Sequence, residues 1–194
     1  SSLEAIWSSR ERAKITAIII AGAARLAGQF LAAGKIDGVV GVGGSTGSLM
    51  ATEVMRTLPF GLPKLMISST AALPGLSTRY IGTGDIALFH SVVEISGVSD
   101  LLKNVFDRAA FAMAGMVSEG ITPPRAGKGK AIALTMLGPC EKCASLVRVG
   151  LERAGYQVIG FSAAGIGDRA METMIAEGLF HGVIDLAPGG VGEH

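Results

Sequence analysis

Gly38-Val-Val-Gly-Val-Gly-Gly-Ser-Thr-Gly-Ser48 is the most informative segment of this 194-residue chain. It begins as a short apolar run, passes through adjacent glycines and ends in hydroxyl residues that open a helical pattern. A strand, a glycine-rich turn and a helix in this order are typical of α/β folds with a parallel sheet. The segment therefore predicts a βα unit whose turn lies at the carboxyl end of its strand.

The same alternation continues on both sides of this segment. Short and nearly continuous apolar runs predict strands covered on both faces, as in a parallel sheet. These strands are expected at Gly38–Val42, Lys64–Ser68, Ile86–Phe89, Ala131–Met136, Gln157–Phe161 and Gly182–Leu186. Helices are expected between them, at Ser48–Leu58, Ser99–Ser118, Cys140–Ala154 and Asp168–Glu177. Strands that alternate with helices predict an α/β protein.

The start of the chain allows two interpretations. Its apolar run KITAIII is either a buried strand followed by a helix from Ala23, or part of one long helix over Leu3–Ala33. No turn residue interrupts Glu4–Ile20, and this favours the single helix. In both interpretations Gly34 is suited to a helix C-terminus.

A linker is predicted at Gly120–Gly129, GITPPRAGKG, because paired prolines end a helix and the glycines around them favour a loop. It divides the chain into a lobe at 1–120, a linker at 121–129 and a second lobe at 130–194. The second lobe closes with a strand and a glycine-rich turn that no helix follows. We therefore expect an incomplete second lobe and a chain that is a fragment of a longer protein.

Composition excludes several classes of protein. A net charge of +1, with 17% charged and 5% aromatic residues, provides neither the basic field nor the stacking surface that nucleic acid requires. The richest apolar run, Ile15–Ala24, has ten residues, fewer than the ~20 of a membrane-spanning helix. No signal peptide is recognisable, and two cysteines make no disulfide framework. We therefore expect a cytoplasmic protein that binds neither nucleic acid nor membrane.

The glycine turn, residues 43–48, is the main candidate site. A turn that joins a strand to a helix directs backbone N–H groups and the positive end of the helix dipole at one point, which suits an anion. Thr46 stands where the dinucleotide fingerprint needs glycine, and Gly47 stands where the Walker motif needs lysine. The turn therefore predicts a phosphate or carboxylate site of unspecified type, unless it is only a tight turn with Ser45 as its N-cap. Its residues are Gly43, Gly44, Ser45, Thr46, Gly47 and Ser48.

Three other stretches lie at the ends of predicted strands, where open α/β sheets bind their ligands. Thr70 belongs to a hydroxyl cluster suited to a phosphate or a ribose, or to a capped loop. Thr83 and Asp85 precede a strand, where the aspartate suits a ribose, a metal ion or an ordinary turn. A second glycine-rich turn opens a further helix, and its arginine either clamps an anion or is solvated. The candidate residues of that turn are Gly165, Gly167 and Arg169.

No set of residues forms a convincing catalytic constellation, so whether the chain is an enzyme stays open. Cys140 and Cys143 lie between a strand and a helix, as in thioredoxin-like redox motifs, but inert thiols are the simpler interpretation. His90 leads toward Glu94, which makes an acid–base pair conceivable. The three histidines are too far apart for a recognisable metal-ligand spacing, and we expect no metal site.

An ordered set of motifs resembles a known family. After the segment 38–48 come Leu58-Pro59 with Gly61-Leu-Pro-Lys64, Tyr80-Ile-Gly-Thr83 with Asp85, Ser91-Val-Val-Glu-Ile95 with Gly97, Ala114-Gly-Met-Val117, Thr135-Met136 with Gly138, and Arg169-Ala-Met-Glu172. Together they look like the ATP-binding domain family of the tomato mosaic virus resistance protein and its uncharacterised bacterial and fungal relatives. The resemblance covers nearly the whole chain.

The resemblance implies two lobes with Rossmann-like parallel sheets flanked by helices, a nucleotide at the glycine turn, and dimers or larger assemblies. It makes Thr70, Thr83 and Asp85 site candidates beside the glycine turn, and it does the same for the second turn. The second lobe departs from the family, because Ser162-Ala-Ala-Gly165 replaces His-Ala-Thr-Gly and Asp168 replaces a glycine.

We therefore expect a homo-oligomer that binds ATP, with or without Mg²⁺, through the glycine turn. Two other functions are compatible with the sequence. The first alternative is an enzyme domain that acts on a small phosphorylated or carboxylated metabolite. The second is an oligomerising interaction module in which the glycine turn is vestigial.

Overall fold

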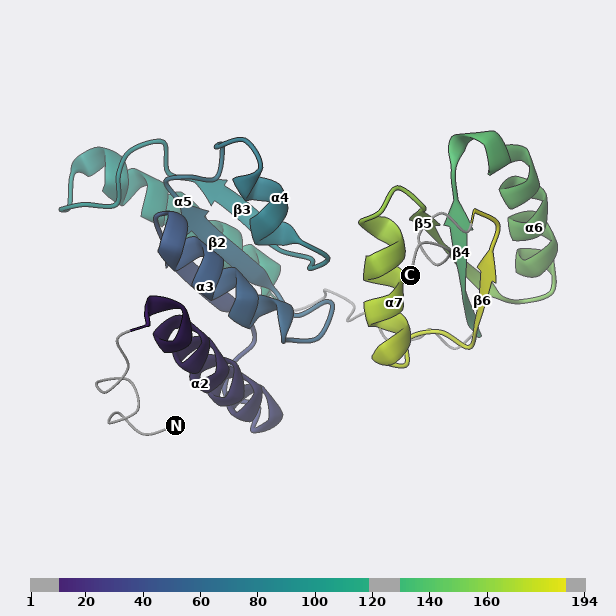
Figure 1. Cartoon of the computed structure of the whole chain (residues 1–194), viewed down its shortest axis with the longest axis horizontal. Helices are drawn as coiled ribbons and strands as arrows, with labels where there is room; N and C mark the ends of the chain where they lie inside the picture. The colour runs from purple at the N-terminus through teal and green to yellow at the C-terminus, as the bar shows by residue number, and fades with distance from the viewer. Residues whose placement is uncertain (1–10, 119–129, 188–194) are drawn as a thin grey trace. The chain divides into compact units, whose positions relative to one another are not determined.

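The computed structural model describes residues 11–118 and 130–187. The chain divides into two compact units, Ser1–Ile121 and Thr122–His194, and each is described by itself. Each unit has a three-stranded parallel sheet flanked by helices (Figure 1). The predicted α/β fold class is confirmed, whereas the predicted linker at 121–129 lies outside the described residues.

The strands of the first unit are β1 (Val39–Gly43), β2 (Lys64–Ser68) and β3 (Ala87–His90), in the order β1-β2-β3. Gly43 is in register with Ser68, and Ser68 with His90, so the three carboxyl ends share one edge of the sheet. The helices of this unit are α2 (Arg12–Ala32), α3 (Ser45–Arg56), α4 (Leu76–Ile81) and α5 (Asp100–Met116). The glycine turn joins β1 to α3 and therefore lies at the edge where open sheets bind ligands.

β2 is the buried centre of this sheet. All five of its residues are buried, and their side chains alternate between the two faces. Leu65 and Ile67 pack against Val105 of α5, whereas Met66 packs against Met55 of α3. Helices α3 and α5 therefore cover opposite faces of the sheet.

β1 is incompletely covered. Val40 and Val42 are 50% and 48% exposed, while Gly41 between them is buried against α3. The expectation that the apolar strands are covered on both faces is therefore wrong for β1. An apolar run has the same pattern in a central strand and in an edge strand, and only the pairing of the strands separates the two.

α2 is one continuous helix, so the single-helix interpretation is confirmed over the described residues. It lies along α3 (Figure 1), and none of its residues is buried. The helix has 21 residues and is, by length and composition alone, able to cross a membrane. The length of the apolar run, ten residues, is therefore a poor guide to the length of this apolar helix. The absence of membrane binding stays a prediction.

The strands of the second unit are β4 (Ala131–Met136), β5 (Gln157–Ser162) and β6 (Gly182–Asp185), in the order β5-β4-β6. A 3₁₀ helix, η1 (Gly138–Cys140), leads into α6 (Glu141–Arg153), and α7 (Gly167–Ala176) follows β5. Leu134, Ala144 and Val158 form the core of this unit. Both units together contain the six predicted strands, each within one residue of its predicted ends, whereas α4 and η1 were not predicted.

Candidate functional site

The glycine turn leaves the N-terminus of α3 open. Gly44 is the N-cap, and no side chain of the described residues caps the helix. The alternative with Ser45 as N-cap is therefore wrong, because Ser45 is already the first helical residue. Ser48 N donates to Gly44 O at 2.8 Å, the first hydrogen bond of the helix. The N–H groups of the three residues before Ser48 have no acceptor within the helix. They form a cluster of donors at the positive end of the helix dipole.

Buried hydroxyls support the turn from below. Ser48 Oγ lies 2.7 Å from Ser68 Oγ, which lies 3.2 Å from Thr70 Oγ1, and Thr70 Oγ1 lies 2.7 Å from the hydroxyl of Tyr80. Ser48, Ser68 and Tyr80 are each fully buried. The structure therefore brings Ser48 and Thr70 together, but as parts of a hydrogen-bonded wall between β2, α3 and α4 rather than as free hydroxyls.

Charged groups of both signs lie close to the turn. Arg12, in the first turn of α2, donates from Nη2 to Thr46 Oγ1 at 3.3 Å, which places a guanidinium group beside the open helix end. Glu94, beyond β3, accepts a 3.3 Å hydrogen bond from Ser69 Oγ. Sequence reasoning missed Arg12, because it is 34 residues from Thr46 and no local pattern connects them.

Thr83 and Asp85 lie at the amino ends of the strands, whereas the glycine turn lies at their carboxyl ends. The Asp85 carboxylate accepts from Lys64 Nζ at 2.7 Å and from Gly61 N at 2.6 Å. Lys64 begins β2 and Ser68 ends it, so the two edges are about 13 Å apart at the usual rise per residue. The structure therefore does not bring these two candidates to the glycine turn, and Asp85 forms a partly buried ion pair with Lys64.

A strained turn follows β3 at the same edge as the glycine turn. Val92 has a φ of 65°, which is rare for a β-branched residue. Val93 N donates to Ser91 O at 2.7 Å, closing a γ-turn around Val92. Residues with such a strained backbone cluster at active sites and ligand-binding segments. No local sequence pattern predicts the backbone conformation of Val92.

The second glycine-rich turn is hydrogen-bonded by side chains of its own residues. Arg169 Nε donates to Gly165 O, and the buried Asp168 carboxylate accepts from Arg169 N at 2.9 Å. A carboxylate in the first turn of α7 occupies the place of an incoming anion. Gly167 packs so tightly that a Cβ would collide with Ser162 O. These contacts use part of the hydrogen-bonding capacity of the turn, and anion binding by its candidate residues stays a prediction.

The cysteine pair and the histidines form no further constellation within the described residues. Cys140 and Cys143 are free thiols, and Cys140 Sγ lies 3.5 Å from Leu186 O. His181 accepts a hydrogen bond from Ala131 N, and His90 is exposed at the end of β3. Over residues 11–118 and 130–187, no group of three metal-ligating side chains is close enough to hold an ion. The redox alternative stays a prediction.

Family models match both units of the chain. The N-terminal domain of an uncharacterised protein family, UPF0261, matches residues 1–121, and the C-terminal domain of the same family matches residues 129–194. The chain belongs to the UPF0261 family. The predicted family is thereby confirmed, whereas ATP binding by this UPF0261 chain stays a proposal.

Relatives of this UPF0261 chain come from bacteria and plants. A UPF0261 protein of Clostridium tetani is 36% identical over 186 residues, which are 96% of this chain and 45% of that protein. The tomato (Solanum lycopersicum) ToMV resistance protein Tm-1(GCR237) is 38% identical over 156 residues, which are 78% of this chain and 20% of that protein. This UPF0261 chain therefore spans less than half the length of either relative.

Proposed function

We propose that this UPF0261 chain binds a nucleotide, ATP, through phosphates held at the glycine turn. The observation that carries the proposal is the uncapped N-terminus of α3 at the carboxyl edge of the sheet. Helix ends that lack a capping side chain satisfy their N–H groups with water or with an anion. Glycine at the N-cap leaves room for the anion, since a Cβ there would have Ser69 Oγ, at 3.7 Å, as its nearest neighbour.

The residues around the turn would have different roles in binding the nucleotide. The first-turn N–H groups of α3 would donate to the phosphate oxygens, and the Arg12 guanidinium beside Thr46 would neutralise part of their charge. Ser48 and Thr70 would hold the turn in place through the buried hydroxyl wall. Glu94 adds a carboxylate at this edge, which favours a phosphate that carries Mg²⁺ over a bare phosphate.

A second candidate function is catalysis on a small phosphorylated or carboxylated metabolite. Glu94 supports it, because its carboxylate lies 3.3 Å from the Ser69 hydroxyl beside the anion turn and is suited to take up a proton. Turnover that is lost in Glu94→Gln would favour this function over simple nucleotide binding. Asp85 does not support it, because its carboxylate is held by Lys64 at the other edge.

Calorimetric titration tests the proposal directly. ATP is titrated into the purified chain with and without Mg²⁺, and inorganic phosphate and NAD serve as controls. Micromolar ATP binding that phosphate alone does not reproduce is the expected result. Equal affinities for ATP and phosphate would reduce the site to a general anion turn, and absence of binding would reject it. Cytoplasmic location and homo-oligomeric state stay predictions.

A further inference from the structure

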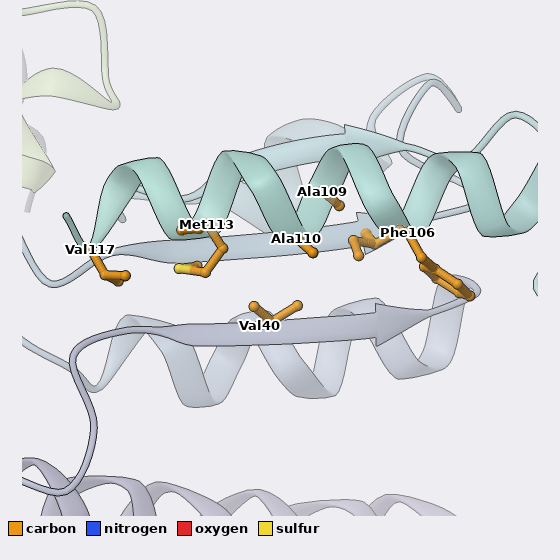
Figure 2. A pocket seen from close by; sticks show the side chains of 8 residues that line it. Val40, Phe106, Ala109, Ala110, Met113 and Val117 are labelled. Carbon is orange, nitrogen blue, oxygen red and sulfur yellow. The ribbon is translucent and has the colours of Figure 1, made fainter.

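An apolar groove of about 480 Å³ lies between β1 and α5 in the first unit. Figure 2 shows Val40 of β1 across the groove from a row of α5 side chains. The groove is lined by Val40, Ile67, Phe106, Ala110, Met113 and Val117. Within the part of the chain that the structure describes, no charged side chain lines it, so its natural occupant is an apolar surface rather than a charged ligand.

β1 beside this groove is an edge strand. Over residues 11–118 and 130–187, it pairs with β2 and with no strand on its other side. Parallel strands are normally covered on both faces, whereas Val40 and Val42 are half exposed here. The unpaired N–H and C=O groups of an edge strand are in addition able to pair with another strand. The open edge and the open face belong to the same strand, and one added strand–helix unit would cover both.

The position of α2 indicates on which side that element lies. Helix α3 connects β1 to β2 and lies on the face opposite α5, and α2 lies along α3 (Figure 1) and leads directly into β1. Crossovers between parallel strands are right-handed. A strand that precedes α2 therefore belongs beside β1 on the edge away from β2, where α2 would cover it. Such a strand also explains why α2, although apolar, has no buried residue.

We propose that a further parallel strand pairs with the outer edge of β1 and that an adjoining helix fills the groove beside α5. The occupant is a strand–helix unit of the longer UPF0261 polypeptide. The parts of this chain outside the described residues are ten, eleven and seven residues long, whereas a strand together with a helix that covers it takes about 17 residues at the usual lengths of these elements. The Clostridium tetani relative extends well beyond the match, which covers 45% of its length.

Fragment complementation tests this proposal independently of nucleotide binding. The 194-residue chain is mixed with the purified part of the Clostridium tetani relative that lies outside the matched region, and the complex is measured by light scattering after gel filtration. A one-to-one complex is expected, together with slower hydrogen exchange at residues 39–43. Val40→Lys should weaken the complex at least about tenfold, because it places a charge in the apolar groove.

A second substitution on α5 provides the matched control. Phe111→Lys changes an exposed apolar residue of α5 that does not line the groove, and it should leave the complex intact. Both substitutions are at exposed positions, so both variants should fold, as circular dichroism would verify. A dimer of the chain that Val40→Lys dissociates would overturn the proposal, because the groove would then bind a second copy. Absence of any complex, or equal loss in both variants, would also overturn it.

Discussion

Gly44→Val tests the glycine turn most directly. Gly44 has a φ of −81° and a ψ of −160°, an extended conformation that valine adopts. A Cβ at this position would have Ser69 Oγ, at 3.7 Å, as its nearest neighbour. We therefore expect the fold to survive, with a loss of no more than about 1 kcal/mol in the free energy of unfolding, because valine is a poorer N-cap than glycine.

The same substitution should strongly reduce nucleotide binding. The branched side chain would occupy the space beside the first-turn N–H groups, and a phosphate would lose at least two charge-assisted hydrogen bonds. At about 1.5 kcal/mol each at the lower limit, this loss amounts to about 3 kcal/mol, or a rise in the Kd for ATP of at least about 100-fold.

Calorimetry on the wild type and on two variants measures this effect. Gly28→Val is the control, because a Cβ at Gly28, in the exposed α2, has no neighbour within 4 Å. The control should bind ATP like the wild type, and urea unfolding should verify that both variants are folded. A folded Gly44→Val variant with an unchanged Kd would refute the assignment of the phosphate site to this turn.

Three other predictions concern the stability and reactivity of the chain. Lys64→Met leaves the Asp85 carboxylate without its ammonium partner, and we expect the free energy of unfolding measured in urea to fall by about 3 kcal/mol. A fall below about 1 kcal/mol would show that the ion pair is dispensable for stability. Gly167→Ala drives a Cβ into Ser162 O and should destabilise the second unit by about 2 kcal/mol, which an unchanged thermal transition would contradict. Cys143 is the more exposed of the two thiols, so maleimide labelling should show one fast phase that Cys143→Ser removes, and two equal phases would argue against this exposure.

The site illustrates how far local sequence patterns reach. The open turn at the end of β1 was predictable, because adjacent glycines after an apolar run predict a strand-to-helix turn. The contact of Arg12 with Thr46 was not, because it joins residues 34 positions apart across two helices. Asp85 was a candidate ligand-binding residue in the sequence because no local pattern shows its ion pair with Lys64, which lies 21 positions earlier.

Local sequence patterns are enough to predict the alternation of strands and helices and the position of the glycine turn. Those features depend on hydrophobic periodicity and on backbone preferences within a few residues. Three other features follow only from the tertiary structure. Ser48 lies buried under the turn, Asp85 lies at the amino ends of the strands, and β1 is the unpaired outer strand of the sheet with a groove beside it. These properties depend on which strands become neighbours, and that choice follows from the packing of side chains that are distant in the sequence.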